Sequence, residues 1–193
     1  TPKPSSAASD VYKRQVIIIL TTSMLVSFSA FSAEKDTTVI GGVEMPEIQN
    51  SKAFNQVKKK LGKWEGEMTQ GLTGAVYDVS YVFELTSGGN TVTETIIEDG
   101  IQMLTTYSDN DGELVIKHYC ALGTEPIFKV DTLSKKAFAI KLDKSKSNLH
   151  ADHESFVTDM KWTMHSKDSM TFENTVMLDG EPTDNRAILK RVY

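Results

Sequence analysis

The clearest indication of the fold comes from residues 76–121, VYDVSYVFELTSGGNTVTETIIEDGIQMLTTYSDNDGELVIKHYCA. Apolar and polar side chains alternate along four segments of this stretch, and a side-chain period of two is that of a β-strand. Short sequences rich in Gly, Asn and Asp separate the segments, at Ser87–Asn90, Asp99–Gly100 and Asp109–Gly112. Such residues favour the tight turns of hairpins. The pattern therefore predicts consecutive antiparallel hairpins.

The same period continues on both sides of this stretch and predicts ten strands in all. The predicted strands are Trp64–Leu72, Val76–Leu85, Thr91–Ile97, Ile101–Ser108, Glu113–Ala121, Ile127–Leu133, Ala137–Leu142, Phe156–Met164, Ser169–Leu178 and Arg186–Val192. Many short strands joined by hairpin turns favour an antiparallel meander. Closing such a sheet on itself removes its exposed edges. We therefore expect an all-β protein, a closed up-and-down barrel of eight to ten strands.

One short N-terminal helix is predicted at Ser51–Leu61, where Asn50 or Ser51 can cap its start and Gly62 suits the position after its end. The basic cluster Lys58–Lys60 is then interpreted as a solvated face beside this helix. The longest loop is expected at Asp143–Asp152, as a lid or simply as a mobile segment.

The N-terminal part of the chain is not expected to belong to the barrel. Residues 1–15 are rich in Ser, Ala and Pro and resemble a translated sequencing adapter rather than a natural leader. Residues 16–33 carry no charge and end in small residues, as a signal peptide cleaved near Ala30–Ala33 does. Residues 34–50 are then a linker and residues 51–193 the barrel. These features predict a secreted or periplasmic protein that is not inserted in a membrane after cleavage.

Composition excludes several classes of function. The chain has 193 residues, 21 Lys and Arg against 26 Asp and Glu, and one Cys. An acidic chain lacks the clustered cations that nucleic acid attracts, so we expect no nucleic-acid partner. A single Cys closes no disulfide within the chain, and no metal site is expected. The segment His150–His153 has two His and one Asp in a polar loop, which is weak evidence for a metal site.

The start and the end of the barrel carry a resemblance. Gly62-Lys63-Trp64 resembles the Gly-x-Trp motif of lipocalins and their calycin relatives, in which an Arg of the last strand lies across the Trp. The resemblance implies that role for Arg191 or Arg186, through cation–π stacking.

An ordered set of motifs is similar to exported lipocalin-like proteins of unknown function. These motifs are Gly62–Gly66, Ser87–Gly89, Met103–Tyr107 and His118–Gly123. The opening GKWEGE is also similar to nitrobindin-like haem barrels, a family that supplies its axial His near the chain end. Residues 184–191 hold no His, so a haem cofactor is not expected, nor is any other.

Strand alternation predicts which side chains face the lumen. They are Tyr77, Tyr81, Phe83, Val92, Glu94, Ile96, Ile101, Met103, Thr105, Tyr107, Leu114, Ile116, His118, Cys120, Phe138, Ile140, Phe156, Met160, Trp162, Met170, Phe172, Asn174 and Val176. Apolar walls with a few convergent polar groups are typical of a small-molecule pocket. The candidate ligand-binding residues are Glu94, His118, Tyr107, Tyr81, Tyr77, Met103, Cys120, Trp162 and Asn174.

Glu94 is the hardest of these to explain as part of a filled core, because a buried carboxylate needs a partner or a raised pKa. We hypothesise that Glu94 pairs with His118 and that a hydroxyl of Tyr107 or Tyr81 completes a polar end of the cavity. Three interpretations stay open. The barrel binds a small, largely apolar ligand, or it is an enzyme with Glu94 and His118 as base and acid, or it is filled and acts through its exterior. Cys120 is interpreted as an inert buried thiol rather than a nucleophile.

Overall fold

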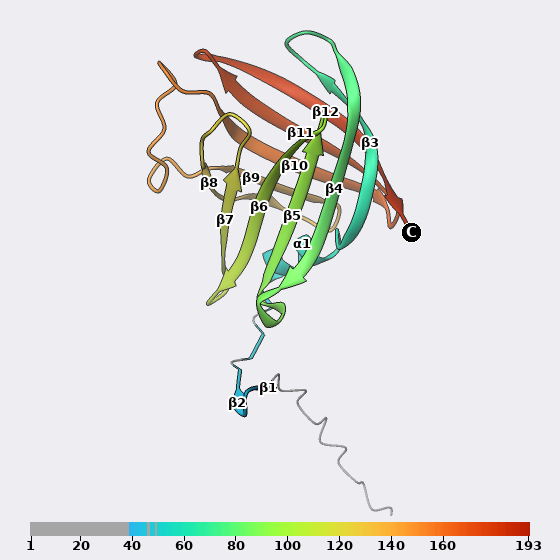
Figure 1. The fold of residues 1–193 in the computed structure, drawn as a ribbon, viewed down its shortest axis with the longest axis vertical. Helices are drawn as coiled ribbons and strands as arrows, with labels where there is room; N and C mark the ends of the chain where they lie inside the picture. The colour runs from blue at the N-terminus through green and yellow to red at the C-terminus, as the bar shows by residue number, and fades with distance from the viewer. Residues whose placement is uncertain (1–38, 46, 49) are drawn as a thin grey trace, which may run out of the picture. The chain divides into compact units, whose positions relative to one another are not determined.

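The structure is a computed structural model that describes residues 39–45, 47–48 and 50–193. Ten antiparallel strands form a closed barrel (Figure 1). The strands are β3 (Gly62–Gln70), β4 (Val76–Thr86), β5 (Thr91–Glu98), β6 (Ile101–Asn110), β7 (Glu113–Tyr119), β8 (Ile127–Leu133), β9 (Ala137–Leu142), β10 (Phe156–Ser166), β11 (Ser169–Leu178) and β12 (Glu181–Val192). Each strand pairs with its neighbours in sequence, and β12 pairs with β3 to close the barrel.

The predicted closed, up-and-down, all-β barrel is confirmed. Three strands have the predicted bounds, and the largest difference is β12, which begins at Glu181 rather than Arg186. Residues 181–185 read EPTDN and lack the alternation, but they pair along their length with β11. Backbone pairing does not require an apolar face, so the hydrophobic pattern underestimates a strand that extends past the core.

The described residues before the barrel include a short hairpin and a helix. The strands β1 (Val39–Ile40) and β2 (Val43–Glu44) form a hairpin of two residues each within the stretch expected to be a linker. The helix α1 (Lys52–Lys58) follows, and a short 3-10 turn, η1 (Ser87–Gly89), lies between β4 and β5. The predicted leader at residues 1–15 and signal peptide at residues 16–33 lie outside the described residues.

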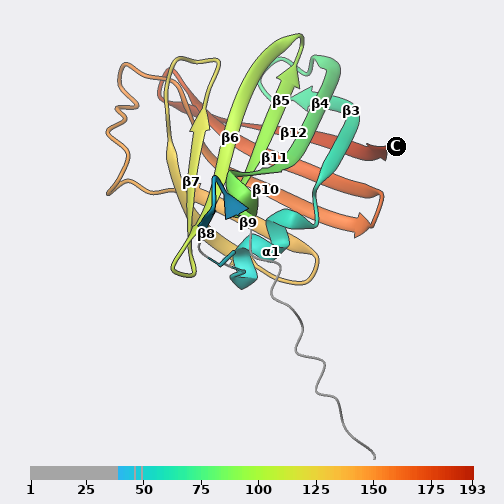
Figure 2. The same cartoon turned by 60° about the horizontal axis from the view of Figure 1, so that its bottom comes forward.

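Helix α1 covers one end of the barrel, as Figure 2 shows. The Ser51 hydroxyl caps it by accepting from the amide of Phe54 at 3.1 Å. The Ser51 amide donates to Asp109 Oδ2 at 2.7 Å, which holds the helix start against the end of β6. Phe54 and Val57 are fully buried and insert into the barrel end. The barrel therefore has one end closed by a helix.

The helix is shorter than predicted. It ends at Lys58, and the chain turns inward over the next residues instead of completing another helical turn. Gly62 does not cap the helix: it has φ of +108° and begins β3. A positive φ is open to glycine and rarely to other residues, so Gly62 makes the bend between helix and barrel.

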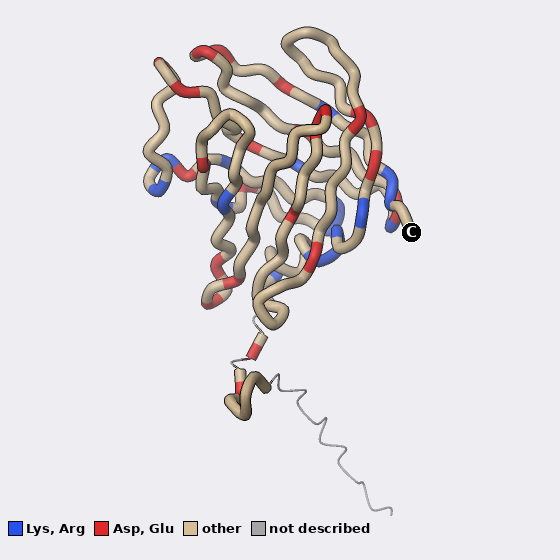
Figure 3. Tube along the Cα trace, viewed as in Figure 1, with Lys and Arg blue, Asp and Glu red and all other residues tan. Residues whose placement is uncertain are grey.

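The predicted inward face is confirmed almost throughout, because every residue of that set except Ile101 is buried or half-buried. Ile101 is 55% exposed, since it is the first residue of β6 and lies at the rim. Acidic and basic residues are interspersed over the strands and loops (Figure 3). No helix in the described part of the chain is long and apolar enough to cross a membrane.

Candidate functional site

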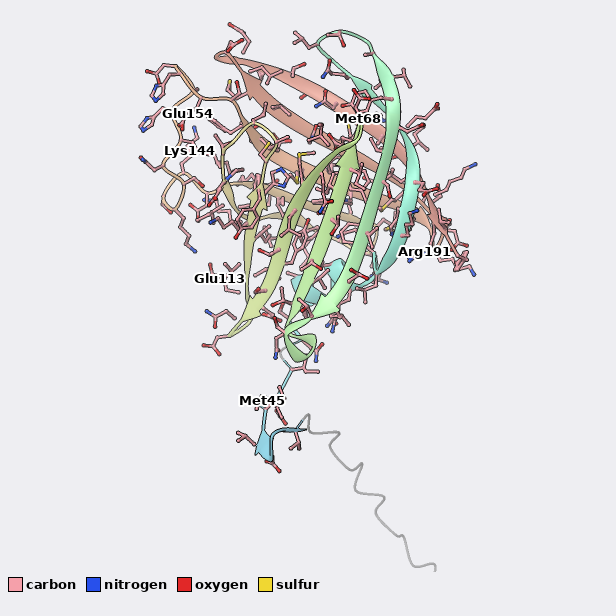
Figure 4. The ribbon with its side chains drawn as sticks, viewed as in Figure 1. Met45, Met68, Glu113, Lys144, Glu154 and Arg191 are labelled. Atoms are coloured by element: carbon pink, nitrogen blue, oxygen red, sulfur yellow. The ribbon has the colours of Figure 1, made fainter. Side chains whose placement is uncertain are left out.

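Trp64 and Arg191 stack on each other at the closed end of the lumen. The Arg191 guanidinium carbon lies 4.2 Å from the centroid of the Trp64 ring, a cation–π arrangement. The same guanidinium donates to the carbonyls of Leu61 and Lys59, and Figure 4 shows Arg191 at the end of β12 beside β3. Arg191 therefore has the role that the sequence left open between two arginines, whereas Arg186 is exposed on the outside of the barrel.

Lys60 does not lie on a solvated face: its side chain is buried inside the barrel. The Trp64 indole donates to the Lys60 carbonyl at 2.7 Å and fixes the backbone there. The Lys60 ammonium group lies 4.4–5.9 Å from the ring centroids of four aromatic residues, Phe83, Tyr107, Phe138 and Trp162. We call Lys60 and these four residues the Lys60 cage. The interpretation of Lys58–Lys60 as a wholly solvated cluster is therefore wrong for its last residue.

Glu94 lies beside this cage. Its Oε2 accepts a hydrogen bond from the Tyr107 hydroxyl at 2.6 Å, and Phe83 is its neighbour across the strand pair. Its Oε1 has no hydrogen-bond partner among the described residues, and the same is true of Lys60 Nζ and Trp162 Nε1. Three buried polar atoms without partners therefore lie in or beside one aromatic cage.

The two charged groups of this region have strongly shifted pKa values. Burial lowers the pKa of Lys60 to about 7, although the nearby Glu94 partly opposes the change. Burial likewise raises the pKa of Glu94 to about 7, against the effects of the Tyr107 hydrogen bond, of Lys60 and of the Thr105 hydroxyl. Both shifts have the same cause, because a low-dielectric interior disfavours the charged form of either group. Near neutral pH the pair therefore exchanges charged and uncharged forms.

The hypothesised contact between Glu94 and His118 is not formed. His118 Nδ1 instead hydrogen-bonds Thr105 Oγ1 at 2.9 Å, and the cross-strand partners of Thr105 are Glu94 on one side and His118 on the other. Burial lowers the pKa of His118 to about 4. His118 is therefore a neutral imidazole at pH 7, and Thr105 lies between it and Glu94.

A cavity of about 300 Å³ occupies the half of the lumen away from α1. Its walls are mainly apolar, and His118 is one of the polar groups on them. Five of the predicted ligand-binding residues line it: Tyr77, Met103, His118, Cys120 and Asn174. The other four, Glu94, Tyr81, Tyr107 and Trp162, are buried in the lumen but are not on the cavity wall. Burial raises the pKa of the Cys120 thiol, which makes it less reactive.

Glu98 also lies on the cavity wall, although it is not among the residues predicted to face the lumen. Its Oε1 accepts from the Tyr81 hydroxyl at 2.6 Å, and burial raises its pKa. Strand alternation could have identified Glu98, because it follows Glu94 and Ile96 on the inward face of β5. The predicted strand ended one residue too early at Ile97, so its side chain was not assigned to either face.

A larger hollow lies on the outside of the barrel, over β3, β10, β11 and β12, with a volume of about 1,090 Å³. Half of the residues that line it are charged, and some of them pair with each other, as Lys161 does with Glu173 at 3.1 Å. It is a solvated concave face of the sheet rather than an enclosed pocket. His150 and His153 stack in the loop after β9. Within the described residues, no three His, Cys, Asp or Glu side chains are grouped to hold a metal ion.

Acidification should destabilise the fold through His118. Its pKa is about 4 in the folded protein against 6.5 normally, so the unfolded chain binds the extra proton between these values. The contribution of His118 to the free energy of unfolding is complete above pH 6.5 and falls as the pH decreases toward 4. We expect His118→Gln to gain about 2–3 kcal/mol relative to wild type between pH 7.5 and 4.5.

Urea unfolding of both proteins at the two pH values measures this difference, and the comparison cancels the opposite contribution of Glu94. His150→Gln, in the exposed loop, is the matched control and should track the wild type. An equal difference between wild type and His118→Gln at both pH values would show that His118 is not held neutral.

Comparisons with known proteins agree with the fold. No family model matches the sequence, and no curated protein matches it significantly. A solved protein of unknown function from the DUF3598 family of Nostoc punctiforme superposes with a TM-score of 0.54 at 14% identity, over 71% of this chain and 49% of that one. The match thus spans about half of the Nostoc protein. Rv2717c from M. tuberculosis superposes with a TM-score of 0.51 at 17% identity, over 76% of this chain and all of that one. The likeness is one of fold alone and agrees with the closed ten-stranded barrel of this chain.

Proposed function

We propose that this protein binds a small, largely apolar molecule in the open half of its barrel, and that it does so outside the cytoplasm. The observation that supports binding is the cavity of about 300 Å³. Ligand pockets are typically 300 Å³ or larger, with mostly apolar walls and a few polar groups. The signal-peptide pattern of residues 16–33 supports export.

The contents of the lumen favour binding over a filled barrel. Aromatic side chains fill the half near α1, where Trp162 packs against Phe138 and Phe172 with centroid distances of 5.7 and 5.3 Å. The other half has no such packing and is open at the rim. His118, Tyr77 and Asn174 give a ligand uncharged polar contacts. Burial raises the pKa of Glu98 on the same wall, so the ligand we propose is small and carries little charge.

The acid–base alternative has less support. Glu94 is fully buried and is not on the cavity wall, so a molecule in the cavity does not contact it. His118 is uncharged at neutral pH and lacks the proton that a general acid donates. We therefore favour binding over catalysis at the cavity.

A fluorescent probe tests whether the cavity accepts an apolar molecule. N-phenyl-1-naphthylamine should bind the wild type with increased fluorescence, because it brightens when it leaves water. Cys120→Phe places a larger side chain on the cavity wall and should weaken binding by at least about tenfold, which corresponds to 1.4 kcal/mol.

Val115→Phe is the matched control. Val115 lies on β7, the strand that Cys120 directly follows, and is 44% exposed on the outer face. This variant should therefore bind the probe as the wild type does. Equal weakening in both variants, or no binding by the wild type, would contradict the proposal. Native mass spectrometry of the protein purified from its own host would then identify what occupies the cavity.

A further inference from the structure

The closed half of the lumen contains a polar site that the proposed function does not use. Lys60 Nζ, Glu94 Oε1 and Trp162 Nε1 are buried and have no hydrogen-bond partner within the described residues. No ion pair within 4.0 Å joins Lys60 to Glu94 in that part of the chain, even though each affects the pKa of the other. Buried polar groups are nearly always satisfied in proteins. Three exceptions in one place indicate a site that accepts a polar group.

The three groups have complementary chemistry. The Lys60 amine is held by aromatic rings rather than by a carboxylate, so its lone pair is free whenever the amine is uncharged. Its lowered pKa makes the uncharged form abundant near neutral pH. Trp162 Nε1 is only a donor, and Glu94 Oε1 can carry a proton in the same pH range. A nucleophilic amine beside two hydrogen-bond donors suits a carbonyl group, with the carbon near the amine and the oxygen near the donors.

We propose that the Lys60 cage is a covalent capture site for a small aldehyde or ketone, with Lys60 as nucleophile and Glu94 and Trp162 facing the carbonyl oxygen. The Lys60 nitrogen forms a bond to the carbonyl carbon, and the oxygen takes a proton from the Glu94 carboxyl. The nitrogen returns a proton to Glu94. Glu94 then protonates the hydroxyl, which leaves as water while the carbon–nitrogen double bond forms. The product is a protonated Schiff base beside the Glu94 carboxylate, and no oxidant or reductant is consumed.

Within this proposal, the carbonyl compound passes from the open half of the lumen into the cage only when the packed rings of Trp162 and Phe172 move aside. Phe172 lines the cavity and packs on Trp162 of the cage. Ile96 also lines the cavity, and Glu94 lies two residues along the same face of β5, ~7 Å deeper. Cavity and cage are therefore adjacent layers of one lumen. Capture needs passage through the cavity, but it does not require a ligand to remain bound there.

Reductive trapping with propanal tests the proposal. The wild-type protein is incubated with propanal and cyanoborohydride at pH 7, and the propylated residue is located by peptide mass mapping. We expect one propyl group at Lys60, formed earlier than on any exposed lysine. Propylation spread over exposed lysines with none at Lys60 would overturn the proposal. This result comes from the wild-type chain and does not depend on a variant that folds.

Three variants sharpen the assignment. Lys60→Met should abolish the early propylation, whereas Lys52→Met, which removes an exposed lysine of α1, should leave it unchanged. Glu94→Gln keeps the size of the side chain but cannot transfer the proton, so the rate at Lys60 should fall by at least about a hundredfold. An unchanged rate in Glu94→Gln would contradict its assigned role.

The naphthylamine titration on the same samples separates the two proposals. A protein that binds the probe but is not propylated at Lys60 disproves capture and leaves ligand binding in place. A protein propylated at Lys60 that does not bind the probe disproves the proposed function and leaves capture in place.

Discussion

Lys60→Met is expected to raise the free energy of unfolding by about 1–4 kcal/mol at pH 7, the range found when buried ion pairs are replaced by apolar side chains of similar size. Lys60 is 1% exposed and its amine has no hydrogen-bond partner within the described chain. Methionine is unbranched, apolar and flexible enough to fill the same space among the rings. Glu94 is not left as an unpaired charge, because without Lys60 it stays protonated and still accepts from Tyr107.

Two effects compete at this position, and their magnitudes decide the sign. Cation–π contacts stabilise a desolvated ammonium by ~2 kcal/mol or more. Removing the same ammonium from water costs several kcal/mol after relaxation. On these magnitudes desolvation is the larger of the two, and burial lowers the pKa of Lys60 in spite of the nearby Glu94.

The pH dependence gives this prediction a second observable. The folded pKa of Lys60 is about 7 and its ordinary value is 10.5, so the unfolded chain binds more protons between these values. Wild-type stability from this group therefore rises with pH across that window. The advantage of Lys60→Met should be largest at pH 7 and below, and should shrink toward pH 10.

Urea unfolding at pH 7 and pH 9.5 measures both effects. Lys52→Met is the control, because Lys52 is exposed at the start of α1, and it should change stability by no more than about 0.5 kcal/mol. A Lys60→Met protein less stable than the wild type would mean that the aromatic rings hold the ammonium favourably, and that the lowered pKa is wrong.

Gly66→Ala is expected to destabilise the barrel by about 4 kcal/mol or more, in the range of the most damaging single substitutions. A Cβ at Gly66 would lie 2.0 Å from the carbonyl oxygen of Ile188 and 3.3 Å from the Cα of Leu189. Both belong to β12, which pairs with β3 where the barrel closes. Backbone cannot rotate away as a side chain does, so the two strands must separate at that point.

Gly112→Ala is the control that separates the effect of a steric clash with a neighbouring strand from the effect of a positive φ. Gly112 has φ of +83° and open space around the added Cβ, so alanine there should cost ~1–2 kcal/mol, the usual penalty of a left-handed residue. Thermal unfolding of the three proteins gives the comparison. A Gly66→Ala protein that unfolds at the temperature of Gly112→Ala, or higher, would show that β3 and β12 tolerate the contact.

Local pattern was sufficient for most of the architecture. Hairpin turns such as Asp99–Gly100 and Asp109–Gly112 and an unbroken period of two predicted ten strands and their inward faces. The reason is that alternation and turn chemistry are local properties, carried by neighbours in the chain. The largest error falls where backbone pairing outweighs pattern, because residues 181–185 are a polar extension of β12.

The candidate site was predicted in composition but not in arrangement. Glu94, Tyr107 and His118 were expected to meet, yet Thr105 lies between Glu94 and His118. The separation depends on the order of β5, β6 and β7 and on their register, which no single strand encodes. Only part of the predicted ligand set lines the cavity, because large aromatic side chains from β10 and β11 fill the other half of the lumen.

Taken alone, the order of residues specified a closed barrel of hairpins and the side chains that face inward, because period and turn residues act over a few positions. Packing in three dimensions determined the rest: that Lys60 is buried among rings contributed by four different strands, and that an open cavity remains only beyond them. A lysine in a basic run has no local mark of burial. Its environment is created by Phe83, Tyr107, Phe138 and Trp162, which are distant in sequence and meet only when the barrel closes.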